Sequence, residues 1–122
     1  MLLLSLFLVS NLSQAQTPIT QVHKAADKLT REMVSVLQLN EADAVQLYKY
    51  NRERFTKLAT LQQQAAQLTQ RQEDLKRSQL EQEYHERIFR ILNAQQYVQY
   101  KRFKESRREF TQPTQVMASL GR

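Results

Sequence analysis

Aromatic and basic side chains alternate in two stretches of the chain, residues 48–55 and 97–104. An apolar ring beside a mobile cation can hold an unfolded polypeptide segment loosely, through hydrophobic contact and long-range attraction. The chemistry predicted for these stretches is therefore non-covalent binding. An alternative is that any one of the rings belongs to the core of the molecule or of a dimer. The candidate client-binding residues are Tyr48, Lys49, Arg52, Phe55, Tyr97, Tyr100, Lys101, Arg102, Phe103 and Lys104.

Residue types that catalyse reactions or bind metals are sparse in this sequence. Cysteine is absent, which excludes disulfides, thiol catalysis and cysteine-based zinc sites. The two histidines, His23 and His85, show no ligand spacing, so no metal site is predicted. No glycine-rich phosphate loop is present, and no nucleophile stands beside a base. We therefore predict a protein that is not an enzyme and has no catalytic residues, metal or cofactor.

Helices are the elements that must position the two stretches. Residues 19–112 contain neither glycine nor proline, and they are dominated by good helix formers. Apolar residues at three- and four-residue steps between Val22 and Leu37 are typical of an amphipathic helix. We predict an all-α fold of about four helices, over residues 21–37, 41 to about 66, 70–91 and 94–110. A long central antiparallel hairpin would turn at residues 66–69, where Thr69 and Gln72 have the spacing of a capping box.

Two similar phrases, LNEAD at residues 39–43 and LNAQQ at residues 92–96, lie 53 positions apart and mark helix starts. Each asparagine is an N-cap whose side chain can accept from an orphan N–H of the first turn. The residue three positions later can complete a capping box, and the preceding leucine suits a hydrophobic staple. Capping explains every residue type in both boxes, so we favour a structural role over a binding role. The structural motif comprises Leu39, Asn40, Asp43, Leu92, Asn93 and Gln96.

The chain divides into three regions by composition. Residues 1–15 form an apolar run followed by a small-x-small pattern, which predicts a cleaved signal peptide and export. A membrane anchor is the alternative, but the run is about half of the ~20 residues that a spanning helix needs, so stable membrane insertion is not expected. Residues 16–110 form the helical domain, and residues 111–122, with Pro113 and Gly121, are predicted to be a flexible C-terminal tail.

Charge and core size indicate the kind of partner. The net charge of +6 favours acidic partners, but an exported chain without a recognised motif is not expected to bind nucleic acid. Short chains bury a small fraction of their surface, and these helices are polar, so we predict that two copies share a core as a homodimer.

The two boxes resemble the repeated Leu-Thr-x-x-Gln motif of the Spy/CpxP-like (LTxxQ-motif) periplasmic proteins, which are small, basic and all-helical. The second copy, with Tyr97, Tyr100 and Phe103 after it, is the closer match, and Asn replaces Thr in both. The resemblance covers residues 21–108 and implies four helices in a dimeric, curved cradle. It also implies a periplasmic role in envelope stress, as an ATP-independent chaperone for unfolded or partly folded envelope proteins. The alternative is a regulator that binds a sensor-kinase domain; some relatives are described as metal-responsive.

Overall fold

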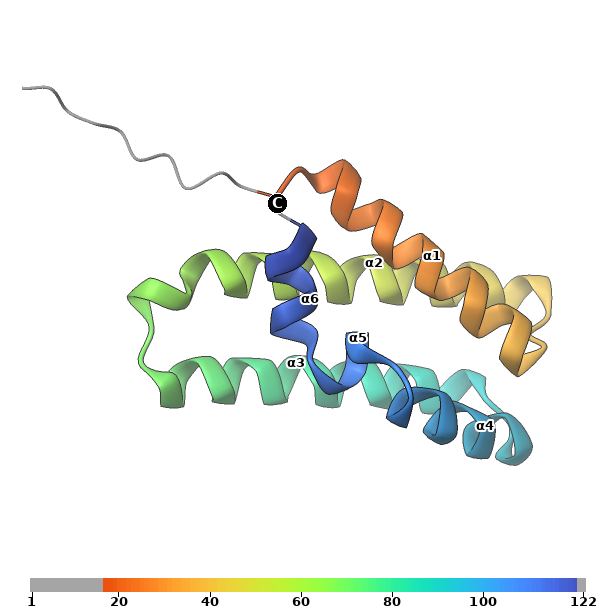
Figure 1. Ribbon diagram of the computed structural model, residues 1–122. Helices are drawn as coiled ribbons and strands as arrows, with labels where there is room; N and C mark the ends of the chain where they lie inside the picture. Colours follow the sequence, from red (N-terminus) through yellow and green to blue (C-terminus); the bar gives the residue numbers. More distant parts are fainter. Residues whose placement is uncertain (1–16, 121–122) are drawn as a thin grey trace, which may run out of the picture.

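The computed structural model describes residues 17–120, and this part of the chain contains helices and no strand (Figure 1). The predicted all-α class is confirmed. Six α-helices occur in the described part, instead of about four. None of them is both long enough and apolar enough to cross a bilayer. The predicted signal peptide, residues 1–15, lies outside the described residues. The elements are α1 (Ile19–Leu37), α2 (Glu41–Gln64), the 3-10 helix η1 (Ala65–Gln67), α3 (Gln70–Ile91), α4 (Ala94–Glu105), α5 (Arg108–Thr111) and α6 (Pro113–Leu120).

Helices α2 and α3 run side by side in opposite directions and form the long axis of the molecule (Figure 1). They are joined through η1, after which Thr69 caps α3. The Thr69 hydroxyl accepts from the Gln72 amide at 3.1 Å, and the Gln72 side chain accepts from the Thr69 amide at 3.0 Å. This predicted capping box is confirmed. Helix α1 packs on α2, and α6 crosses the pair to contact α2 and α1.

The first box begins α2 at the predicted residue, but only half of its capping box forms. Asn40 accepts from the Asp43 amide at 2.8 Å, whereas the Asp43 side chain does not return a bond to Asn40. Helix α1 ends just before it at Leu37, and its C-cap residue Gln38 has a φ of 51°, in the left-handed region. That conformation lets the amides of Gln38 and Leu39 both donate to the Val34 carbonyl and close the helix end.

The second box forms completely and does more than start a helix. Asn93 accepts from the Gln96 amide at 2.8 Å, and the Gln96 side chain accepts from the Asn93 amide at 3.0 Å. The side-chain nitrogen of Gln96, Nε2, also donates to the Leu37 carbonyl at 3.2 Å. One side chain therefore caps α4 and satisfies an orphan carbonyl at the end of α1.

The core is built on the stripe of α1 that the periodicity predicts, and the buried residues of that stripe confirm it. They are Val22, Ala26, Leu29, Met33 and Leu37. The buried face of α2 includes two polar residues, Asn51 and Arg54, beside Phe55 and Leu58. The buried face of α3 is narrow: only Tyr84 and Ile88 of this helix are buried, and Leu75 is exposed.

Asn51 is tolerated in the core because its side chain is hydrogen-bonded on both sides. Its amide nitrogen donates to the Thr30 hydroxyl at 2.8 Å, and its carbonyl oxygen accepts from the Tyr84 hydroxyl. Thr30 in turn donates to the Ala26 carbonyl at 2.8 Å. Buried polar groups cost little when they are satisfied in this way. This chain of hydrogen bonds fixes the positions of α1, α2 and α3 relative to one another.

The C-terminal part differs most from the prediction. Helix α4 ends at Glu105 instead of near Phe110, because Arg107 is extended and pairs with Glu32 of α1 at 2.9 Å. Within the predicted flexible tail of residues 111–122, residues 113–120 are helical in α6 and bury Met117 against the core. Pro113 takes the first position of α6, where its missing N–H costs nothing.

Candidate functional site

Burial divides the predicted binding residues into two groups. Phe55, Tyr100 and Phe103 are buried, so in this fold they are core residues, and their assignment to an exposed binding surface is corrected. Tyr48, Tyr97 and Lys104 are half-buried. The remaining four candidates are exposed, and they are Lys49, Arg52, Lys101 and Arg102.

The basic stretch of α2 is partly committed to holding the fold together. Arg52 binds Asp27 of α1 through two hydrogen bonds, at 2.8 Å and 2.6 Å. The hydrogen bond from Arg52 holds the pKa of Asp27 below its ordinary value. This arrangement ties α2 to α1, so Arg52 is less available to an external partner than the sequence suggests.

A groove opens where α3 and α4 diverge. Of the two stretches predicted to bind clients, only the one on α4, residues 97–104, contributes side chains to its lining. Its volume is about 410 Å³, and of the predicted residues it contains Tyr97, Tyr100 and Lys104. The predicted residues of α2 are not among those that line it. The full lining is His85, Glu86, Phe89, Arg90, Tyr97, Tyr100 and Lys104.

Phe89 is the most unusual feature of the groove, because 62% of this large apolar residue is exposed. Its ring stands perpendicular to the Tyr97 ring, with the centroids 5.3 Å apart. The ring centroids of Tyr97 and Tyr100 lie 6.4 Å apart. Tyr100 is only 2% exposed and connects the groove to the core. Edge-to-face aromatic pairs of this kind add ~0.5–1.5 kcal/mol beyond the area that they bury.

Cations surround these rings. The Lys101 ammonium lies 5.4 Å from the Tyr97 ring centroid, and the Lys104 ammonium lies 5.7 Å from that of Tyr100. Lys101 lies beside the groove, and the lining itself holds two positive charges, those of Lys104 and Arg90, whereas Glu86 is the single carboxylate there. The groove therefore combines an aromatic floor with an excess of positive charge.

His85 connects two of these groups. Its Nδ1 lies 2.7 Å from the Tyr100 hydroxyl, and its Nε2 lies 3.3 Å from the Lys104 ammonium. Burial, and after it the Lys104 charge, lower the pKa of His85. Burial raises the pKa of the Tyr100 hydroxyl, which therefore stays protonated at physiological pH.

A buried arginine supports the groove from behind. The Arg54 guanidinium donates to Glu81 of α3, at 2.8 Å and 3.0 Å, and to the Glu109 carbonyl of α5 at 2.8 Å. It also lies 4.7 Å from the Phe110 ring centroid and 5.1 Å from that of Tyr84. Arg54 thus links α2 to α3 and α5, and it contacts Phe110, against whose ring Tyr100 packs.

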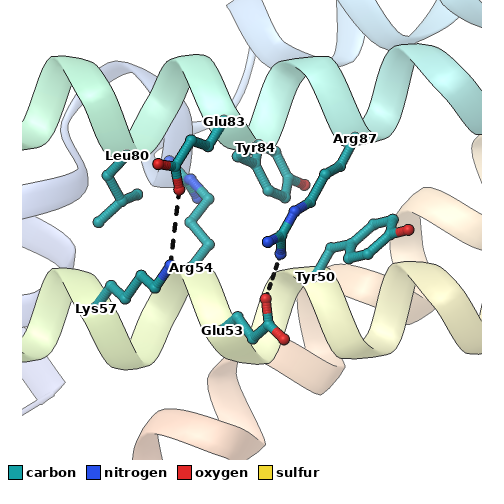
Figure 2. Close-up of a pocket in the computed structure, with 8 residues that line it drawn as sticks. All are labelled: Tyr50, Glu53, Arg54, Lys57, Leu80, Glu83, Tyr84 and Arg87. Carbon is teal, nitrogen blue, oxygen red and sulfur yellow. Dashed lines mark hydrogen bonds and ion pairs between the residues drawn. The ribbon is translucent and has the colours of Figure 1, made fainter.

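The middle of the seam between α2 and α3, around Glu53 and Tyr84, is too tight to be a binding site (Figure 2). Arg87 pairs there with Glu53 and lies over the Tyr50 ring at 5.4 Å, while Lys57 pairs with Glu83 at 3.7 Å. The space between these side chains is about 10 Å³, which is on the scale of one water molecule. Sequence spacing predicts instead that Glu83 pairs with Arg87 along the helix, but Arg87 reaches across the seam.

Sequence reasoning missed the α3 wall of the groove. From the sequence, His85 is assessed only as a metal ligand, and Phe89 and Arg90 are not among the candidate client-binding residues. The sequence does contain one signal, which is Phe89 itself. This large apolar residue lies outside the apolar stripe of its helix, so the amphipathic pattern gives it no place in the core. Among residues 17–120 no cluster of three potential metal ligands occurs.

No protein-family model matches the chain, and comparisons with curated proteins and with solved structures also give no match. The resemblance to the Spy/CpxP-like proteins therefore rests on the two boxes alone.

Proposed function

We propose that the protein is an exported, Spy/CpxP-like chaperone that holds unfolded or partly folded envelope proteins without using a nucleotide. The observation that carries the proposal is the exposed Phe89 ring in a groove whose other lining includes Tyr97 and two cations, Arg90 and Lys104. Covering a fully exposed phenylalanine contributes ~1.5–3 kcal/mol, so Phe89 supplies one part of a weak and reversible interaction.

The groove is better suited to many clients than to one. An open aromatic surface accepts any apolar segment, because hydrophobic contact has no direction. The nearby cations attract acidic segments from a distance and are not committed to a fixed ligand geometry. The periplasmic location and the dimeric cradle belong to this proposal, and they are supported by the apolar leader sequence and by the resemblance.

Suppression of aggregation tests the proposal directly. The chain beginning at residue 16, mixed at stoichiometric excess with a chemically denatured enzyme, is expected to reduce light scattering without ATP. Phe89→Gln should weaken this effect several-fold. Leu75→Gln is the matched control, because Leu75 lies on the same helix, is 58% exposed and does not line the groove.

The contribution of charge is tested with a second matched pair. Arg90→Gln should weaken suppression, and raising the salt concentration should do the same, whereas Arg71→Gln on the exposed start of α3 should not. A folded protein that does not suppress aggregation refutes the proposal, as does a Phe89→Gln variant as active as wild type. If no generic client is protected and a pull-down yields one saturable sensor-kinase domain, the regulatory alternative replaces it.

A further inference from the structure

The contacts of His85 determine which of its ring nitrogens carries the proton. The Lys104 ammonium has only donors, so Nε2, at 3.3 Å from it, must act as the acceptor. In the neutral ring the single proton then lies on Nδ1, which donates to the Tyr100 oxygen at 2.7 Å. The opposite tautomer would place an N–H against an ammonium group, so this contact favours the Nδ1–H tautomer.

Protonation of His85 destroys this arrangement. The new proton has only Nε2 to occupy, and it converts the acceptor that Lys104 uses into a donor. Two positive charges would then lie about 3.3 Å apart in a half-buried site. Lys104 is partly exposed on a flexible side chain, so it can move away, whereas the imidazole is held by Tyr100.

The other charged groups around His85 do not compensate for this repulsion. From α2 it faces Arg54, which adds a further positive charge. On its own helix Glu81 raises the pKa of His85, but less than burial and Lys104 lower it, since its carboxylate is already bound by Arg54; Glu86 is exposed. From α4 the neighbours are Lys104 and the neutral hydroxyl of Tyr100.

We propose that His85 is a pH-sensitive latch on the α3–α4 groove. Neutral His85 holds Lys104 across the face of Tyr100, and protonated His85 releases Lys104 and uncovers that ring. This inference rests on the proposed function of the groove and adds its regulation. Acidification between pH 7.5 and 5.5 should strengthen the binding of apolar segments, up to ~10-fold if binding shifts the pKa of His85 by one unit.

The binding experiment uses a fluorescent aromatic peptide without titratable groups, so that pH acts only on the protein. Anisotropy titrations at pH 5.5, 6.5 and 7.5 should give tighter binding at low pH for the wild-type chain. His85→Gln should bind equally at all three values, because its amide can accept from Lys104 and donate to Tyr100 but cannot titrate. His23→Gln, which changes the only other histidine, should keep the wild-type response.

A second measurement tests the latch without any ligand. Nitrogen NMR of the imidazole should show the Nδ1–H tautomer at pH 7.5, and Lys104→Gln should raise the pKa of His85, since the Lys104 charge lowers it. The Nε2–H tautomer, an unchanged pKa in Lys104→Gln, or a pH response retained in His85→Gln would overturn the inference. If the peptide does not bind at any pH, the proposed function of the groove fails, and the NMR result alone decides whether the latch exists.

Discussion

Removing the charge of Glu81 should be among the most damaging single changes in this protein. Arg54 is buried, with its side chain 1% exposed, and Glu81 is the carboxylate that neutralises it. Removing one partner of a buried ion pair leaves an uncompensated charge, which typically lowers the free energy of unfolding by ~3–5 kcal/mol. Glu81 is itself 21% exposed and the Glu109 carbonyl would remain, so for Glu81→Gln we expect about 3 kcal/mol from the lower end of that range. In a domain of this size the melting temperature should fall by roughly 10–20 °C.

Urea and thermal unfolding followed by circular dichroism measure this loss. Glu83→Gln is the matched control, because Glu83 lies on the same helix but forms an exposed pair with Lys57, which is worth ~0–1 kcal/mol. The double variant Arg54→Met/Glu81→Gln should recover most of the stability, since it removes both the charge and the Nη1 group that lacks a hydrogen-bond partner. If Glu81→Gln lowers the free energy of unfolding no more than Glu83→Gln does, Glu81 does not neutralise Arg54 as we describe.

Three further predictions concern caps and charge. Asn93→Ala should lower the free energy of unfolding by ~1 kcal/mol in urea titrations while aggregation suppression per folded molecule is unchanged; unchanged stability with lost suppression would make the second box a binding motif. Gln38→Gly should raise the free energy of unfolding by ~1 kcal/mol, because glycine adopts the left-handed conformation without a Cβ penalty; Gln38→Ala, which keeps the Cβ, should show no gain. The pKa of Asp27 is lowered by the hydrogen bond from Arg52, so its ionised form stabilises the fold above its ordinary pKa of 3.8, and this contribution disappears as pH falls through the lower folded value. Wild type should therefore be more stable than Asp27→Asn at pH 7, and the difference in urea midpoints should shrink below about pH 4; a constant difference would contradict this account.

Local signals were sufficient for most helix boundaries. The buried stripe of α1, and the starts of α2, α3 and α4 at Asn40, Thr69 and Asn93, follow from spacing and capping chemistry within a few residues of each position. Asn51 and Arg54 could not be predicted in the same way. Their burial depends on partners such as Tyr84 and Glu81, which lie 33 and 27 residues away in the chain.

The candidate site and the C-terminal helices show a similar limit. Arg107 follows the end of α4 in an extended conformation and pairs with Glu32 of α1, and the chain is redirected there so that α6 buries Met117. The sequence carried a weak signal in Pro113 followed by Val116, Met117 and Leu120, but the run is too short for periodicity to be decisive. The groove depends on where α3 and α4 diverge, which is a tertiary property.

The hydrogen bond between Gln96 and the Leu37 carbonyl brings the two boxes to the same end of the molecule, although they are 53 residues apart in the chain. Each box follows one helix and begins the next, so α1 with α2 and α3 with α4 are two versions of one helix–cap–helix unit. Tandem duplication of a short ancestral gene segment would produce this arrangement. Only Gln96, and not its counterpart Asp43, makes the reciprocal cap, so the two boxes differ at the position that joins α4 to α1.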